Sequence, residues 1–246
     1  MAASKATTTW GSVRRLQGGL IVSCQASEGE PLNAPEHILA MSLAAIAGGA
    51  RALRLEGAEN IATIRNCAKL AGNVPIVGLI KSAFVKPEDR LTSVYITSTF
   101  EEACLIHESG ADIIALDATG RPRPDGLSVK ETIEKIHKEL NKPVWADCAS
   151  FEQGVSAAED GADIVSTTMY GYTKETALPS DAPPDLNFLK RLAEAVSIPV
   201  ILEGRVWHPK EVSEAFERGA YAVVVGSAIT RPTVITERFV RAIPHK

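Results

Sequence analysis

The sequence predicts an α/β protein whose eight parallel strands close into a single (β/α)8 barrel, the TIM barrel. Eight short apolar runs alternate with eight segments of helical pattern along the 246 residues. A Gly-Ala pair recurs at Gly49, Gly110, Gly161 and Gly219, with gaps of 61, 51 and 58 residues. Each gap has the length of two βα units. No Gly-x-Gly-x-x-Gly follows the first strand, so an open dinucleotide-binding sheet has little support.

The strands are predicted from nearly continuous apolar runs, which are typical of parallel strands covered on both faces. A ninth short strand is predicted at Val94–Thr97, inside the loop that follows the third strand. The eight barrel strands are predicted at Leu20–Cys24, Ala52–Leu55, Pro75–Ile80, Asp112–Leu116, Pro143–Ala146, Asp163–Ser166, Pro199–Leu202 and Tyr221–Val225.

The helices are predicted from amphipathic segments between these runs, several of which begin with a recognisable capping signal. Thr99 and Ser150 start N-cap patterns, and Pro209 suits the first position of a helix. The glycine of each recurring Gly-Ala pair is expected to end a helix in the left-handed conformation. The predicted helices are His37–Ala47, Ala58–Leu70, Thr99–Glu108, Val129–Leu140, Phe151–Glu159, Leu186–Val196, Pro209–Arg218 and Thr233–Ile243.

Composition excludes several classes of protein. The net charge of −4 and the aromatic content of 5% argue against a nucleic-acid binder. No apolar run reaches the roughly 18 residues of a membrane-spanning helix, so no membrane partner is expected. We expect one domain over residues 1–246, with residues 1–15 as a loosely ordered extension.

The four cysteines stand far apart and form no Cys-x-x-Cys, so neither a zinc site nor a disulfide framework is indicated. They are expected to be buried small apolar residues. No histidine pair has metal-ligand spacing, so no metal is expected either. With no apolar signal segment between Met1 and Leu16, the sequence favours a cytoplasmic protein.

The strongest functional signal lies after the seventh and eighth strands, where barrels commonly bind phosphate. Gly204 follows the seventh strand, and Gly226-Ser227 follows the eighth and leads to Arg231. Glycines let a phosphate approach backbone N–H groups, and an arginine can add a bidentate contact. The alternative is that these glycines only make tight turns.

Two titratable residues at strand ends are the candidate catalytic residues. Lys81 follows the third strand and could act as a base with a lowered pKa, as a charged group that stabilises an enolate, or as a Schiff-base nucleophile. It could also be a solvated loop residue. Glu203 ends the seventh strand and suits acid–base chemistry, or it could pair with a barrel arginine or lysine.

Other strand ends supply further candidates. Arg54 could hold a substrate oxygen or pair with Glu56. Asp117 and Asp147 occupy equivalent strand ends, and either could orient Lys81. Gln25 follows the first strand and Thr168 follows the sixth.

Taken in order, these strand ends resemble the N-acylglucosamine-6-phosphate 2-epimerases, which act on N-acetylmannosamine 6-phosphate. The resemblance covers the chain from about Gly18 to Ala242. The matching stretches are Gly19-Leu-Ile-Val-Ser-Cys-Gln-Ala, Gly78-Leu-Ile-Lys81, Val94-Tyr-Ile-Thr, Ile114-Ala-Leu-Asp117-Ala-Thr, Ala146-Asp147, Thr167-Thr-Met-Tyr-Gly-Tyr-Thr173, Glu203-Gly204-Arg205 and Val225-Gly-Ser-Ala-Ile-Thr-Arg231-Pro232.

The resemblance implies cofactor-independent epimerisation at C2 of N-acetylmannosamine 6-phosphate, in sialic acid and aminosugar catabolism. It implies Lys81 and Glu203 as the catalytic pair. Substrate contacts are expected from Gln25, Arg54, Asp147, Thr168 and Tyr172, and phosphate contacts from Gly204, Gly226, Ser227 and Arg231. A homodimer with the C-terminal helix in the contact is also implied. The alternatives are a Schiff-base aldolase and a phosphosugar-binding regulator without turnover.

Overall fold

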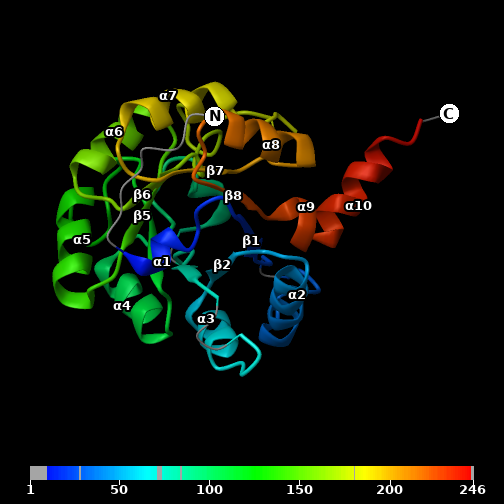
Figure 1. Cartoon of the computed structure of the whole chain (residues 1–246), viewed down its shortest axis with the longest axis horizontal. Coiled ribbons are helices and arrows are strands. Elements are labelled where there is room, and N and C mark those ends of the chain that lie inside the picture. Colours follow the sequence, from blue (N-terminus) through cyan, green and yellow to red (C-terminus); the bar gives the residue numbers. More distant parts are fainter. Residues whose placement is uncertain (1–9, 28, 71–73, 84, 180, 245–246) are drawn as a thin grey trace.

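The computed structural model describes residues 10–27, 29–70, 74–83, 85–179 and 181–244. They form a closed barrel of eight parallel strands paired in chain order, with β8 returning to β1 (Figure 1). The predicted fold class is confirmed. The strands are β1 (Leu20–Cys24), β2 (Ala52–Glu56), β3 (Ile76–Leu79), β4 (Ile113–Asp117), β5 (Val144–Asp147), β6 (Ile164–Ser166), β7 (Val200–Glu203) and β8 (Ala222–Val225).

The strand bounds differ slightly from those predicted, and β3 to β8 each begin one residue later. In β3, β5 and β7 the residue left out is Pro75, Pro143 or Pro199, and proline has no N–H to contribute to a ladder. At the other end, Asp147 and Glu203 still pair in register and belong to their strands. Their carboxylates are therefore fixed by the sheet rather than carried on loops.

Helices follow the strands and cover the outside of the barrel (Figure 1). Thr99 and Ser150 form the predicted capping boxes, and Pro209 opens α8. The four recurring glycines have φ of 94–100°, as predicted for left-handed helix ends. The long helices are α2 (Pro35–Ala47), α3 (Ala58–Arg65), α4 (Phe100–Glu108), α5 (Val129–Lys135), α6 (Phe151–Glu159), α7 (Leu186–Ala195), α8 (Pro209–Glu217) and α10 (Pro232–Arg241).

Two predicted helices are shorter than expected, and short helices were missed. α3 ends at Arg65 instead of Leu70, and α5 ends at Lys135 and continues as a π-helical turn, η2 (Ile136–Leu140). Asn141 ends this turn by adopting the left-handed conformation, with a φ of 50°. The helices that the sequence pattern did not predict are α1 (Gly11–Arg14), the 3-10 turn η1 (Pro87–Asp89) and α9 (Ser227–Thr230). One to one-and-a-half turns are too short to show a helical period.

The amino-terminal end of the barrel is closed by α1 and the residues around it. Val13 and Leu16 are fully buried and belong to the apolar cluster inside the barrel. Trp10 Nε1 donates a hydrogen bond to Asp163 at 2.6 Å. The loosely ordered extension expected over residues 1–15 therefore does not reach residue 15, while residues 1–9 lie outside the described part of the chain.

The predicted ninth strand at Val94–Thr97 is wrong. Only one antiparallel bridge forms, between Lys81 and Ile96, with Ser82 N–H donating to Tyr95 O and Thr97 N–H donating to Ile80 O. Thr97 then takes a positive φ of 43°, which ends the pairing. This segment folds back over the end of β3, so it belongs to the mouth of the barrel.

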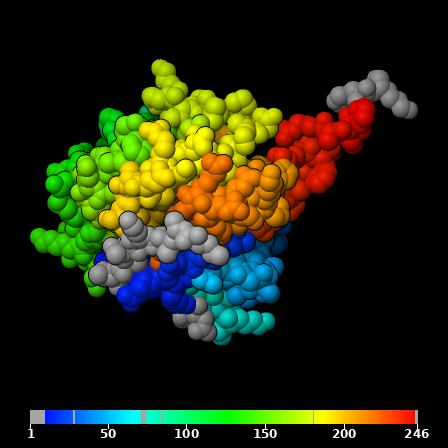
Figure 2. All heavy atoms as spheres, turned by 45° about the horizontal axis from the view of Figure 1, so that its top comes forward, coloured from blue at the N-terminus to red at the C-terminus, as the bar shows by residue number. Residues whose placement is uncertain are grey.

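The carboxy-terminal helix α10 projects from the barrel rather than lying along it (Figures 1 and 2). None of its residues is buried. The side chains of Phe239, Val240 and Ile243 are 73%, 55% and 61% exposed. Across the described residues, no helix is long and apolar enough to span a membrane.

Candidate active site

A pocket of about 380 Å³ opens at the mouth of the barrel, where the strands end. Its walls come from Arg54 of β2 and from residues at and after the ends of β1, β3, β6, β7 and β8. Asp147 lies just behind this wall. The other predicted site residues line it together, namely Gln25, Arg54, Lys81, Thr168, Tyr172, Glu203, Gly204, Gly226, Ser227 and Arg231.

Arg54 connects the buried acids of the site. Its side chain is 1% exposed, with Nη2 2.6 Å from Asp147 Oδ2 and Nε 3.1 Å from Glu203 Oε1. Burial acts to lower the pKa of Arg54, but the two carboxylates raise it above its usual value, so Arg54 stays charged. Nη1 is buried and has no hydrogen-bond partner among the residues that the structure describes. The predicted alternative, a salt bridge from Arg54 to Glu56, is wrong.

Glu203 is held from two sides. Oε1 faces Arg54, and Thr168 Oγ1 donates to Oε2 at 3.1 Å. Burial is the largest effect on this carboxyl and exceeds the attraction of Arg54, while Asp147 adds repulsion. Together they raise the pKa of Glu203 to about 7. A carboxyl with this pKa can both donate and accept a proton near neutral pH.

Lys81 stands across the mouth from Glu203, because β3 and β7 are four strands apart in the ring. The structure shows no hydrogen bond or ion pair from Lys81 Nζ to another described residue. Burial lowers the pKa of Lys81, as do the positive charges of Arg90, Arg231 and Arg54, while Glu56 acts in the opposite direction. Lys81 is thus a partly buried amine without a fixed partner, and not a solvated loop residue.

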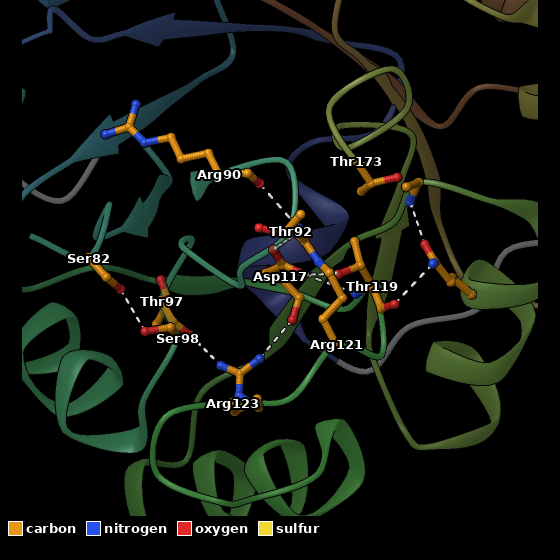
Figure 3. Close-up of polar contacts among 12 residues, drawn as sticks. Ser82, Arg90, Thr92, Thr97, Ser98, Asp117, Thr119, Arg121, Arg123 and Thr173 are labelled. Atoms are coloured by element: carbon orange, nitrogen blue, oxygen red, sulfur yellow. Dashed lines mark hydrogen bonds and ion pairs between the residues drawn. The ribbon is translucent and has the colours of Figure 1, made fainter. Parts of the chain in front are cut away.

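The expectation that Asp117 or Asp147 orients Lys81 is wrong. Asp147 pairs with Arg54, and Asp117 accepts hydrogen bonds from Thr119 and Arg121 (Figure 3). Arg121 also donates to the carbonyl of Arg90 at 3.1 Å. The network around Asp117 therefore fixes the loop between β3 and α4 that folds over the mouth.

The part of the pocket formed by the loops after β7 and β8 has the features of an anion site. The N–H groups of Gly204, Gly226 and Ser227 donate no hydrogen bond to another described residue. Position 204 favours glycine, since the φ of Gly204 is 99° and other residues rarely adopt this value. At Gly226 a Cβ would lie 3.3 Å from Ser23 Cβ. Arg231 lines the same end and pairs with Glu30.

Gln25 and Tyr172 complete the walls of the pocket. Gln25 Nε2 donates to Ser23 Oγ at 2.8 Å, and the Tyr172 ring lies 4.9 Å from the Arg205 guanidinium carbon.

The lining residues that were not predicted include three large polar or aromatic side chains, Tyr95, Arg205 and Trp207. Tyr95 lies in the segment for which the sequence predicts a ninth strand, Val94–Thr97. Arg205 and Trp207 follow Gly204 directly, so the loop after β7 was the available signal.

The cysteines show no sign of nucleophilic chemistry. All four are free, and burial raises the pKa of Cys24 to about 11 and that of Cys148 well above its usual value. Within the described ranges, no group of three or more His, Cys, Asp or Glu side chains is placed to hold a metal ion.

A closed (β/α)8 barrel with an amine and a carboxyl of raised pKa lining one pocket at its mouth has the architecture of a barrel enzyme. Comparison with known proteins gives the family. The model of the NanE family, described as "Putative N-acetylmannosamine-6-phosphate epimerase", matches residues 38–245. The chain belongs to this family, as the resemblance predicted.

Individual relatives match more than nine-tenths of the chain. Proteins described as "Putative N-acetylmannosamine-6-phosphate 2-epimerase" include one from Caldanaerobacter subterraneus subsp. tengcongensis, 44% identical over 95% of this chain and 94% of its own. Another, from Clostridioides difficile, is 43% identical over 93% and 97%. The solved structure of the N-acetylmannosamine-6-phosphate 2-epimerase from Clostridium perfringens is 38% identical, with a TM-score of 0.86 over 96% of this chain and 98% of that chain.

Proposed function

We propose that this protein interconverts N-acetylmannosamine 6-phosphate and N-acetylglucosamine 6-phosphate by moving the proton on C2. The main support for the proposal is that Lys81 and Glu203 lie on opposite sides of one pocket. The amine of Lys81 has a lowered pKa, and the carboxyl of Glu203 has a raised pKa. Membership of the family and the names of its relatives support the choice of substrate.

The reaction needs an acidic C2–H bond, which exists only after the sugar ring opens and C1 becomes an aldehyde. Lys81 then takes the C2 proton, and the electron pair of the broken bond moves to the C1 oxygen to give an enolate. Glu203 assists ring opening, or donates and accepts the proton on the opposite face. A lowered lysine pKa increases the neutral fraction that can act as a base.

Arg54 is placed to stabilise the enolate. Its unpartnered Nη1 is a charged donor in a buried position on the pocket wall. Developing negative charge on a substrate oxygen would satisfy this donor, and Asp147 keeps the guanidinium in place. No cofactor is needed for this proton transfer.

The phosphate is proposed to lie at the end of the pocket formed by Gly204, Gly226, Ser227 and Arg231. Free N–H groups beside an arginine are suited to an anion. Binding the phosphate there would hold C2 between Lys81 and Glu203 through contacts remote from the reacting bond.

We propose a cytoplasmic role in sialic acid and aminosugar catabolism. The four free thiols suit a reducing compartment.

Replacing Arg231 with alanine is expected to raise KM for the phosphosugar about ten- to a hundredfold, because a charged contact to phosphate is lost. KM for the dephosphorylated sugar should stay unchanged. Initial rates on both sugars measure this effect. Equal efficiency of the wild-type protein on N-acetylmannosamine with and without its phosphate would contradict the phosphate site.

We also propose a homodimer formed through α10. The helix extends beyond the barrel (Figure 2), and the side chains of Phe239, Val240 and Ile243 on and just after it are exposed. A second copy offers the same apolar side chains. The Phe239→Glu variant should therefore elute as a monomer in size-exclusion chromatography with light scattering, while the exposed Glu237→Gln variant stays dimeric. A wild-type monomer at all concentrations would contradict the proposal.

The function itself is tested by adding N-acetylmannosamine 6-phosphate to the purified protein and following the NMR spectrum. We expect N-acetylglucosamine 6-phosphate to accumulate to equilibrium. Carbon–carbon cleavage, with loss of activity on borohydride treatment in the presence of substrate, would favour the Schiff-base aldolase. Saturable binding without conversion would favour the regulator.

A further inference from the structure

An ion pair between Arg231 and Glu30 joins the loops after β8 and β1 at the proposed phosphate end of the pocket. Arg231 Nη2 lies 2.5 Å and Nε 3.2 Å from the same oxygen, Glu30 Oε1. Nη2 also approaches Ser27 Oγ at 3.4 Å. The side chains of Arg231 and Glu30 are only 33% and 18% exposed. The pair is therefore a partly enclosed, two-nitrogen contact and not a mobile surface pair.

The loop after β1 holds the Glu30 carboxylate in place. Ser27 N–H donates to Glu30 Oε2 at 2.5 Å, and Glu30 N–H donates back to Ser27 O at 3.0 Å. Partial burial acts to raise the pKa of Glu30, but the contacts with Arg231 and Ser27 lower it below its usual value. Glu30 is thus an ionised, fixed acceptor.

The contact with Glu30 leaves one edge of the guanidinium unused. An arginine has five N–H donors in a rigid fork, and Nε and Nη2 are the atoms engaged by Glu30 and Ser27. Nη1 has no hydrogen-bond acceptor among the described residues. The neighbouring Thr230 is also fixed, since its Oγ1 donates to Ser23 O at 2.8 Å.

We propose that Glu30 is a positioning residue that holds Arg231 so that its Nη1 edge faces the phosphate of the substrate. This inference rests on the proposed function, and it gives Glu30 a role in phosphate recognition without contact to the reacting atoms. A long side chain that must be immobilised on binding lowers affinity by roughly two- to tenfold. Glu30 removes this cost because Arg231 is already ordered in the free protein.

Charge alone predicts the opposite effect, because the Glu30 carboxylate would repel a phosphate bound to the same arginine. The two effects predict changes of opposite sign. If Glu30 positions Arg231, truncating Glu30 weakens phosphate binding. If Glu30 competes with phosphate, truncation strengthens it.

The test is calorimetric titration of the full chain with N-acetylglucosamine 6-phosphate and, separately, with inorganic phosphate. We expect Glu30→Ala to raise Kd for both about three- to tenfold. Glu30→Gln keeps an acceptor oxygen and should stay closer to the wild type. Glu36→Ala, which removes an exposed carboxylate from the first turn of α2, is the matched control and should bind normally.

A double-mutant cycle separates positioning from a general effect on the loop. In the Arg231→Ala background, Glu30→Ala should cause no further loss of affinity, because its effect acts through Arg231. In kinetics, Glu30→Ala should raise KM for the phosphosugar, leave kcat within about twofold, and leave KM for the dephosphorylated sugar unchanged.

Unchanged or tighter binding by Glu30→Ala would overturn the proposal, as would an equal loss in the Arg231→Ala background. Melting temperatures of all variants show whether any loss of affinity is due to unfolding. If Glu30→Ala is unfolded, the Kd of Glu30→Gln and its double-mutant cycle with Arg231→Ala test the proposal instead. The binding readout does not depend on turnover. If the wild-type protein binds phosphate but does not epimerise the sugar, the proposed function fails and the role of Glu30 is still decided.

Discussion

Lys81→Ala is expected to lose measurable epimerase activity while the barrel stays folded. General acid–base groups contribute roughly a hundred- to ten-thousandfold to rate, and Lys81 is the proposed base at C2. The fold should tolerate the change because Nζ makes no hydrogen bond or ion pair with a described residue, and truncation removes a poorly solvated amine. NMR initial rates and a thermal melt measure the two parts of the prediction.

The matched control is Lys86→Ala, an exposed lysine in the same loop. It should retain activity close to that of the wild type. If Lys81→Ala turned over within a few-fold of the wild type and melted normally, Lys81 could not be the catalytic base.

Glu203→Gln is expected to slow epimerisation about a hundredfold or more and to change substrate binding much less. Glutamine keeps the shape of the side chain and an oxygen that faces Arg54 or Thr168, but it cannot transfer a proton. Rates and KM for the phosphosugar separate the two effects. Glu217→Gln, on the exposed face of α8, is the control. A Glu203→Gln enzyme with wild-type kcat would remove Glu203 from the catalytic pair.

The same substitution should also change how stability depends on pH. The carboxyl of Glu203 has a pKa of about 7 in the folded protein and an ordinary value of 4.5. The folded state therefore holds this proton more tightly, and the stability of the wild type relative to Glu203→Gln should fall as pH rises from 4.5 to 7. Thermal melts of both proteins at pH 5 and pH 8 measure the difference.

Much of the barrel is predictable because its signals are local. Buried parallel strands give continuous apolar runs, and the left-handed glycines that end helices, such as Gly110, recur at a regular spacing. The rule that strand ends form the active site then selects Lys81, Glu203 and the glycine turns without knowledge of contacts.

The contacts between distant residues were not predictable in this way. Arg54 was expected to hold a substrate oxygen, with a pair to its neighbour Glu56 as the alternative, but it pairs with Asp147 and Glu203 across the barrel interior. Arg231 and Glu30 are 201 residues apart. Such pairs depend on how the eight strands close into a barrel. The sequence shows only that each of these residues is charged, and not which partner it meets.

The carboxy-terminal helix shows a second kind of limit. The pattern at Thr233–Ile243 predicted an amphipathic helix, and the structure has one at Pro232–Arg241. The resemblance implied a dimer contact through this helix, and Phe239 is 73% exposed. Periodicity predicts that a helix has an apolar face, but it does not show which surface covers that face.

In the proposed reaction the C2 proton leaves the sugar, and a proton returns to C2 during epimerisation. The most direct test is the NMR spectrum of the wild-type protein with N-acetylmannosamine 6-phosphate in D₂O. We expect the N-acetylglucosamine 6-phosphate that forms to carry deuterium at C2, since the lysine amine and the carboxyl exchange their protons with solvent. Product that keeps its original C2 proton in full from the first turnovers, with Glu203→Gln equally fast, would contradict the two-residue proton transfer.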